Sequence, residues 1–478
     1  MQITTAGRWF FDDGGLALPI AAVGALLAAS LLYTTIPFMV LLGIPLCFYF
    51  LTRPFELLVF TAFMIPFNFV FVLGGLPVAA ELLKVLLWGP FVLQLAASKR
   101  EFVVSRYHLP FLVISTLLLY SCVVAGNLPF VLKESLRMGS SIALCYVAVN
   151  LIDTKQKLFV VLESIGISSF ILAIYGLYQF AIQDFGALFW LVNPRISTSL
   201  SPTRDLVYEW RNRIPSFLSG EMEAGEYFNY CIPLAGALFL SAKDRGGRIF
   251  WISTFILLLV GLLLTFTFGA WTAFAAALVY TAWKLRRLVS SRTIVLLIGG
   301  VILASCGLIA ANVDLMRNRI AQIAFDVWTR WDFWTVAWNE FLAHPVFGGG
   351  LGSFGPIVAA AKLEWLERMA PDLADTTSPH NVYMYTLSQF GMVGFLCIWG
   401  VFIHAIRTTV RIGLRQAGKE FRWIALGLGF SLCTLMVAAI TDDSTLFGPH
   451  TSSLIWLVVG LTEVVARLLA PVQGLVKP

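Results

Sequence analysis

Charged side chains are scarce in this chain: only 13% of its 478 residues are Asp, Glu, Lys or Arg, whereas 59% are hydrophobic. This composition excludes an ordinary water-soluble globule, which needs far more polar surface. Apolar stretches of about 16 to 22 residues recur along nearly the whole chain, and each is long enough to cross a bilayer as a helix. Stretches such as 252–264 lack the alternation of a β-barrel strand. We therefore predict an all-α fold, a polytopic membrane helix bundle.

The sequence also lacks the signatures of metal-dependent and nucleotide-dependent enzymes. Its seven cysteines fall within apolar runs and show no CxxC spacing, which is typical of small core residues. Neither a Walker A loop nor an HExxH pair is present, and the GLGSFG segment at 350–355 follows no strand, so we interpret it as a turn. Asp442 and Asp443 come nearest to a metal pair, and a short solvated loop explains them. We predict no metal site and no cofactor, and we expect no nucleic acid partner.

Basic residues are concentrated in short loops. We predict about 12–14 transmembrane helices in one integral membrane domain, residues 1–478, with membrane lipids as its surroundings. Strict alternation then places the Lys- and Arg-rich loops 98–108, 153–157, 243–248, 284–292 and 407–422 on one side, which the positive-inside rule assigns to the cytoplasm. The expected spans begin near Leu16, Thr35, Phe55, Val78, Leu109, Leu136, Leu158, Met222, Phe250, Ala270, Thr293, Asn381, Trp423 and Thr451.

Two long polar segments, 184–221 and 314–380, fall on the side opposite the basic loops. Loops of this length in a compact bundle are usually functional elements or linkers. In the second loop, Trp328, Trp331, Trp334 and Trp338 recur at spacings of three and four, which predicts an amphipathic helix at the membrane interface. An aromatic belt that anchors the loop to headgroups accounts for these tryptophans equally well.

One histidine stands apart from the other four. His380 follows Pro379 where the second long loop enters an apolar span, which predicts an imidazole at a helix start near the membrane surface. A neutral imidazole there can take a proton from a sugar hydroxyl. The alternative is a histidine that only caps the helix.

Arginines on the side opposite the basic loops oppose the positive-inside trend, and a guanidinium binds phosphate oxygens bidentately. Arg211 and Arg213 precede one span, and Arg330 lies in the tryptophan-rich segment. These positions suit a pyrophosphate at headgroup depth. In the alternative, Arg330 pairs with Asp326 and stacks on Trp334. The acidic residues that can pair with the other two arginines are Glu209, Glu221 and Glu223.

A charged pair inside a predicted span supports a different class of function. Glu81 and Lys84 are one helical turn apart, and ionisable residues within a bilayer often mark transport pathways. A flippase or a proton-coupled transporter is therefore an alternative, although one pair falls short of the chain of groups that a pump needs.

Three segments together resemble the superfamily of bacterial O-antigen ligases and O-antigen or exopolysaccharide polymerases. They are RIPSFLSGEMEAG at 213–225, the segment from RWDFW to HPVFGGGLG at 330–352, and the segment from HNVY to GMVG at 380–394. The third is the most specific. The resemblance covers residues 211–401 closely and the rest of the chain only through its multi-span topology.

This resemblance implies a GT-C-like glycosyltransferase in the bacterial cytoplasmic (inner) membrane, with a periplasmic active face. The implied reaction is an inverting, metal-independent transfer of an oligosaccharide or polysaccharide carried on undecaprenyl pyrophosphate. Arg213 and Arg330 would hold the pyrophosphate and stabilise its developing charge, and His380 would activate the acceptor hydroxyl. Glu221 or Glu223 is an alternative base. The substrate-binding residues on this reading are Arg211, Asn381, Tyr383, Glu221, Glu223 and Trp334.

Two departures from the family pattern affect the assignment. The turn around 265–271 lacks an arginine that relatives often carry, and Glu221-Met-Glu223 stands where many relatives have Pro-Asn. Our leading hypothesis is a polysaccharide polymerase, whose acceptor is another lipid-linked repeat. The runner-up is an O-antigen ligase, whose acceptor is lipid A–core.

Overall fold

The computed structural model describes about three quarters of the chain. The described residues are 49–70, 72–73, 76–77, 79–98, 101–183, 213–218, 220–286, 290, 292, 299–300, 303, 306–307, 309–361, 378–415, 419–442, 444–448 and 450–469. The predicted spans near Leu16 and Thr35 lie outside these ranges, as do Arg211 and most of the predicted span near Thr293.

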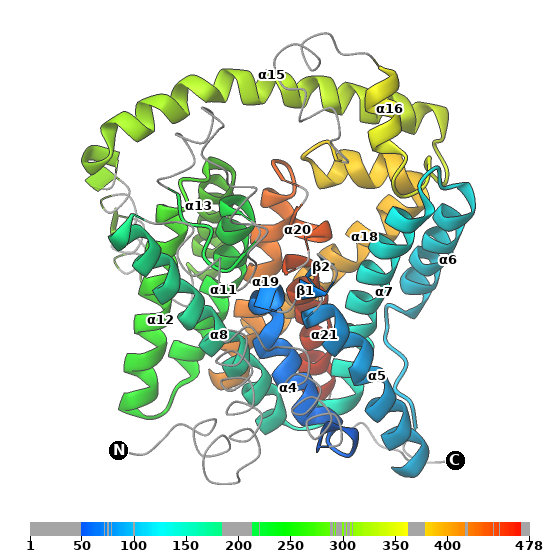
Figure 1. Ribbon diagram of the computed structural model, residues 1–478. Helices are drawn as coiled ribbons and strands as arrows, with labels where there is room; N and C mark the ends of the chain where they lie inside the picture. Colours follow the sequence, from blue (N-terminus) through cyan, green and yellow to red (C-terminus); the bar gives the residue numbers. More distant parts are fainter. Residues whose placement is uncertain are drawn as a thin grey trace.

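The described part of the chain is almost entirely helical, apart from one two-stranded hairpin (Figure 1). The hairpin pairs β1 (Val72–Leu73) with β2 (Leu76–Pro77) in antiparallel register, next to the short 3-10 helix at Ile65–Val70. The helices are α4 (Pro54–Met64), α5 (Ala79–Ser98), α6 (His108–Val124), α7 (Leu128–Leu151), α8 (Lys155–Ile182), α11 (Glu221–Ser241), α12 (Arg245–Leu264), α13 (Phe268–Leu285), α15 (Val313–Ala343), α16 (Phe354–Ala360), α18 (Val382–Arg415), α19 (Lys419–Ala438), α20 (Ser444–Phe447) and α21 (Thr451–Leu469).

Five of these helices are long and apolar enough to cross a membrane, namely α8, α12, α18, residues 421–438 of α19, and α21. Shorter apolar helices lie at Pro54–Phe67, Leu83–Ala97 and His108–Val124. The prediction of an all-α, multi-pass membrane protein is confirmed. Most of the expected spans that the structure describes start within a few residues of a helix start, but α7 begins eight residues before Leu136.

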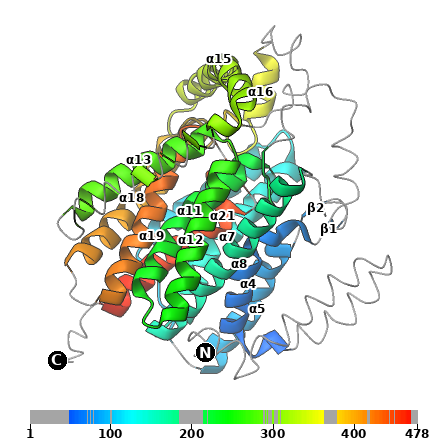
Figure 2. The same ribbon diagram turned by 90° about the vertical axis from the view of Figure 1, so that its left-hand side faces the viewer.

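The bundle has two chemically different ends. At one end, Asn150 in the last turn of α7 bonds to both backbone groups of Val103 before α6, and Arg467 at the end of α21 donates to the carbonyl of Ile152. The basic loops between α5 and α6 and between α7 and α8 therefore lie together, as alternation predicts. At the opposite end, α15 lies across the bundle, over the starts of α13 and α18 (Figures 1 and 2).

The core of the bundle is formed by α11, α18, α19 and α21, which pack on one another and on α7 and α8. Small residues allow close approach: a Cβ at Gly427 of α19 would come within 2.8 Å of the Pro233 carbonyl oxygen in α11. Lys84 of α5 is buried, and its ammonium donates to Ser141 (3.0 Å) and Ser453 (2.9 Å) on two neighbouring helices. Hydroxyl groups thus compensate part of the cost of this intramembrane charge.

The turn between α15 and α16 docks directly on the backbone of α18. Its residues Gly348, Gly350 and Gly352 all have positive φ angles, and α18 itself is broken at Gly391, where φ is 61° and ψ is −167°. Because α18 is broken there, its free backbone groups bond to the turn. These bonds are Gly349 N to Ser388 O (2.8 Å), Gly350 N to Gln389 O (3.0 Å) and Met392 N to Pro345 O (2.9 Å).

Only glycine fits on both sides of this contact. A Cβ at Gly348 would overlap the backbone of Gln389, and a Cβ at Gly391 would overlap the backbone of Val346. Positive φ at these positions adds a conformational penalty for any other residue. The glycine segment is therefore a turn, as predicted, and it fixes the end of α15 to the start of α18.

We predict that Gly391→Ala loosens this contact. The added methyl group meets backbone that cannot move aside, and we expect a loss of about 2 kcal/mol or more in unfolding free energy. Thermal unfolding of the detergent-purified protein measures the change. Gly400→Ala in the same helix is the control, because nothing lies within 4 Å of a Cβ there. Equal midpoints for the two variants would contradict the role given to Gly391.

Candidate functional site

The turn of α15 around residues 330–334 lies against the start of α18. The indole nitrogen of Trp334 donates to the carbonyl of Pro379 (3.1 Å), and the ring of Phe333 lies 6.5 Å from the ring of His380. Phe333 is buried, with 2% of its surface exposed. These contacts place one face of α15 over His380, so two regions of the second long loop meet at a single point.

His380 is held by the backbone that precedes α18. Its φ of 51° is unusual for a residue other than glycine, and its N–H donates to Ser378 Oγ (3.2 Å). The side chain of Asn381 caps the helix by accepting from the N–H of Met384 (3.0 Å). Because Asn381 supplies that cap, the half-buried imidazole of His380 is not needed for it.

Tyr383 and Val382 join α18 to α19. The Tyr383 hydroxyl donates to the Met436 carbonyl (2.5 Å), its ring stacks on Trp399 at 4.1 Å, and Val382 N donates to Ala439 O (2.8 Å). Tyr383 is therefore used for helix packing, and the substrate contact predicted for it stays a prediction.

Arg330 is partly exposed and lies one turn before Phe333 and Trp334. Among the side chains that the structure describes, no carboxylate lies within ion-pair distance of its guanidinium. The side chain of Asp326, the partner weighed from the sequence, lies outside the described set. Arg330 is thus one helical turn from the two residues of α15 that contact Pro379 and His380.

The opposite face of α15 carries exposed aromatic side chains. Trp328, Trp331 and Trp338 expose 48%, 64% and 44% of their surfaces, whereas Val336 and Phe341 are buried. The prediction of an amphipathic helix is confirmed, although the buried face consists mainly of residues other than tryptophan. The exposed tryptophans suit a helix that lies at the membrane–water interface.

The end of α15 carries an acidic side chain beside the glycine turn. Glu340 Oε1 lies 3.9 Å from Nε2 of His344, whose side chain is 57% exposed. Burial raises the pKa of the Glu340 carboxyl, and the charge of His344 opposes that rise. A Cβ at Gly349 would meet the carboxylate end of the Glu340 side chain, so Glu340 lies directly against this part of the turn.

A second cluster surrounds Arg213, which is 3% exposed. Its Nη1 lies 2.7 Å from Glu221 Oε1, its Nε donates to Thr265 O (2.9 Å) and its Nη2 to Thr267 Oγ1 (3.0 Å). This guanidinium therefore ties together three segments: the residues before α11, the first turn of α11, and the turn between α12 and α13. Direct contact between Arg213 and a pyrophosphate stays a prediction, since the described bonds engage all three of its nitrogens.

Sequence reasoning missed a buried pair next to this cluster. His450 Nδ1 lies 2.9 Å from Glu223 Oε2, and His450 N donates to Glu223 Oε1 (3.1 Å); the two side chains are 0% and 2% exposed. A signal was available in the sequence, because His450 follows Pro449 at the start of an apolar span, as His380 follows Pro379. Both Pro-His pairs begin helices at the same end of the bundle.

Further buried acids lie beside this pair. Glu226 accepts from the Tyr230 hydroxyl (3.5 Å), and Asp442 lies within electrostatic range of Tyr230. Both carboxyl groups are buried, with 2% and 7% of the residue exposed. Asp442 was interpreted from the sequence as part of a solvated loop, and its burial shows that this interpretation was wrong.

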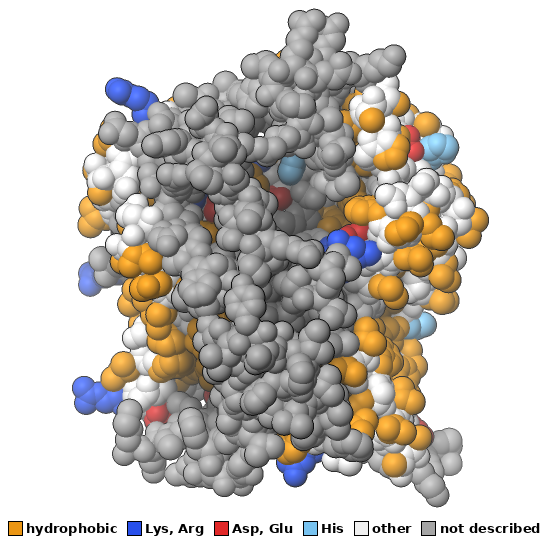
Figure 3. Space-filling view, in the orientation of Figure 1, with side chains coloured by type: hydrophobic (Ala, Val, Ile, Leu, Met, Phe, Trp, Pro, Cys, Tyr) orange, Lys and Arg blue, Asp and Glu red, His pale blue; other side chains and the backbone are white. Residues whose placement is uncertain are grey.

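The region around His380 and the cluster around Arg213 lie at the same end of the bundle, and the end of α19 connects them. Ala439, just after α19, bonds to Val382 of α18. Two residues later, the side chain of Thr441 lies so close to Gly269 of α13 that it would overlap a Cβ there. Figure 3 shows acidic and histidine side chains recessed behind the surface in the upper part of the molecule. Within the described ranges, no group of three or more His, Cys, Asp or Glu side chains is arranged to hold a metal ion.

Part of the chain is similar to a known protein family. Residues 253–399 match the family model described as O-antigen ligase. The matched region runs from α12 through α15 and the glycine turn into α18, so it contains Arg330, Trp334 and His380 but not Arg213, Glu221 or His450. No curated protein matches the chain. The match confirms the resemblance stated from the sequence.

We predict that Arg213 and Glu221 are strongly coupled in stability. Arg213→Gln leaves a buried carboxylate without its cation, and removing one partner of a buried ion pair costs about 3–5 kcal/mol. The double variant Arg213→Gln/Glu221→Gln should recover part of that loss, because it removes both charges. Thermal unfolding of the four proteins of the cycle measures the coupling. Strictly additive effects would show that the two groups do not depend on each other.

Proposed function

We propose that this chain, whose residues 253–399 match the O-antigen ligase family, transfers a glycan from a lipid pyrophosphate to an acceptor hydroxyl at the end of the bundle that α15 covers. The donor is a glycan on undecaprenyl pyrophosphate, and the membrane is the bacterial inner membrane. The observation that supports this proposal is the contact of Phe333 and Trp334, one helical turn after Arg330, with His380 and Pro379.

The proposed active face is the periplasmic one. The basic loops lie at the other end of the bundle, and the positive-inside rule assigns such loops to the cytoplasm. The exposed tryptophans of α15 suit headgroup depth, where the pyrophosphate of a polyprenyl lipid also lies.

The reaction follows from the chemistry of the leaving group. The acceptor hydroxyl oxygen attacks the anomeric carbon and forms the new glycosidic bond, while the bond from that carbon to the pyrophosphate oxygen breaks. The electron pair of the broken bond stays on the pyrophosphate, and the hydroxyl proton passes to a base. Arg330 stabilises the negative charge that develops on the leaving group, in the role that a fixed cation plays in other transfers. No metal is needed for that step, because the guanidinium supplies the charge.

His380 is the base that we favour. It lies at the junction of the second long loop with the bundle, and a neutral imidazole can accept a proton from a hydroxyl group. Glu221 and Glu223 are weaker candidates, because Arg213 and His450 already engage their carboxylates. In this proposal the acidic residues and Arg213 position the first turn of α11 and leave proton transfer to His380.

The acceptor distinguishes two reactions on the same site. A polymerase, our leading proposal, joins the glycan to another lipid-linked repeat. An O-antigen ligase joins it to lipid A–core, and the description of the matching family favours this second candidate. A transporter is supported less well, since hydroxyl groups surround Lys84 and the proposed site lies elsewhere.

We predict turnover by the purified protein without ATP or divalent cations. The assay supplies undecaprenyl-pyrophosphate-linked glycan with EDTA present, in parallel with lipid A–core and without it, and resolves lipid products by mass spectrometry. A polymerase lengthens the glycan on the carrier, whereas a ligase forms product only with lipid A–core. Absence of both products from a folded preparation would contradict glycan transfer altogether.

We predict that His380→Ala and Arg330→Ala each lower the transfer rate roughly a hundredfold or more, because each removes a group that acts on the transition state. The controls are His344→Ala and Arg317→Ala, which alter exposed residues at the two ends of α15. Initial rates with saturating donor measure the effect. Near-normal transfer by His380→Ala would remove this residue from the mechanism, and Glu223→Gln would then be the next variant to test.

A further inference from the structure

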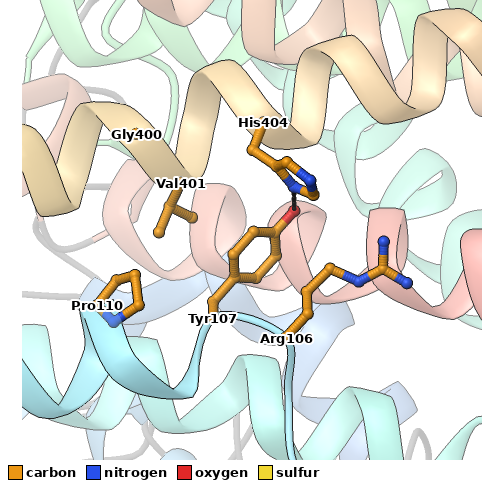
Figure 4. A pocket seen from close by; sticks show the side chains of 6 residues that line it. All are labelled: Arg106, Tyr107, Pro110, Gly400, Val401 and His404. Atoms are coloured by element: carbon orange, nitrogen blue, oxygen red, sulfur yellow. Dashed lines mark hydrogen bonds between the residues drawn. The ribbon is translucent and has the colours of Figure 1, made fainter.

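A cavity of about 520 Å³ opens at the end of the bundle opposite the proposed site. It is lined by Arg106, Tyr107 and Pro110 at the start of α6 and by Gly400, Val401 and His404 of α18. Figure 4 shows Pro110 and Val401 on one side of the Tyr107 ring and Arg106 on the other. The Tyr107 hydroxyl meets His404 Nδ1 at 3.2 Å. Nothing in the proposed transfer reaction uses this cavity.

The cavity lies at the level of the basic loops. Ser105 and Arg106 are fixed there by Glu463 of α21, which accepts from Ser105 Oγ (2.6 Å) and from Arg106 N (2.8 Å). The same end of the bundle carries the bonds between Asn150 and Val103. In a membrane protein this is the depth of the lipid headgroups on the basic side.

Positive charge dominates the mouth of the cavity. His404, Arg407 and Arg411 follow one another on α18 at spacings of three and four, so they share a helix face, and all three are exposed. The Arg106 side chain is 41% exposed, and its Nε lies 3.8 Å from Glu463 Oε1. Among the described residues, the charged groups that act on His404 include Arg106, Arg407 and Arg411 as well as the carboxylate of Glu463. The excess of positive charge fits a ligand with at least one negative charge.

The remaining walls are apolar and continue onto the outer surface of the same helices. Pro110 and Val401 line the cavity, and beside them Leu109 and Leu112 of α6 expose 61% and 63% of their surfaces. Side chains of this kind on the outside of a membrane bundle face acyl chains. A ligand that combines a phosphate with hydrocarbon therefore matches both parts of the cavity, whereas free phosphate matches only its mouth.

We propose that this cavity binds an anionic phospholipid of the surrounding bilayer. Its phosphate lies at the guanidinium groups of Arg106 and Arg407, and its glycerol and acyl chains lie over Pro110 and Val401. Such a lipid bridges α6 and α18, two helices that otherwise meet at this end through the Tyr107–His404 bond. Because His380 directly precedes the other end of α18, the lipid holds the helix beside which the proposed site is built.

Lipid binding to the full chain tests this proposal. The purified protein in zwitterionic detergent is titrated with phosphatidylglycerol, with phosphatidylcholine, and with inorganic phosphate, and bound lipid is counted by native mass spectrometry. We expect phosphatidylglycerol to bind, phosphatidylcholine to bind at least tenfold more weakly, and millimolar phosphate not to displace the bound lipid. Equal binding of the two lipids, or full displacement by phosphate, would overturn the proposal.

Variants locate the lipid. Arg106→Gln/Arg407→Gln should weaken phosphatidylglycerol binding roughly tenfold or more. The control Arg245→Gln neutralises an exposed arginine at the start of α12, on the opposite side of the bundle (Figure 1), and should leave binding unchanged. Equal binding by all three proteins would place the lipid elsewhere. Should the double variant not fold, the comparison of lipids on the unaltered chain still decides the proposal.

Discussion

The contact between two stretches of backbone, without intervening side chains, is the constraint on which the rest of the site depends. Gly348 and Gly391 let the turn after α15 approach the broken helix α18 closely enough for hydrogen bonds between main chains. Because α15 is anchored at this point, its preceding turns are held over the start of α18. The exposed outer face of α15 is then free to lie against the membrane surface while its inner face covers the end of the bundle.

A second set of contacts fixes the other half of that end. Arg213 joins the first turn of α11 to the turn before α13, and His450 joins the same turn of α11 to the start of α21. Buried charges of this kind add little net stability, but each requires its partner, so they favour one arrangement over its alternatives. These contacts therefore hold together the ends of α11, α13 and α21, the helices that pack on α19.

Much of this fold follows from the sequence, because the hydrocarbon core of a bilayer requires apolar helices long enough to cross it, and because basic loops alternate with polar ones along the chain. The start of α18 at His380 and the amphipathic character of α15 were visible in the same way. The pairing of Arg213 with Glu221 was among the alternatives that the sequence offered. The bonds of Arg213 to Thr265 and Thr267 and the pairing of Glu223 with His450 were not, since they join residues up to 227 positions apart and no local pattern specifies them. The role of the glycines was also hidden, because a GxGxxG spacing does not say which backbone will dock on it.

A structure of the full chain with a bound polyprenyl-pyrophosphate-linked glycan would locate the donor. We expect the pyrophosphate beside the guanidinium of Arg330, with the anomeric carbon on the side of His380 and the turn at Gly348 still docked on α18. A donor bound at the basic end of the bundle, or one whose phosphates lie away from Arg330 and His380, would refute the proposed site.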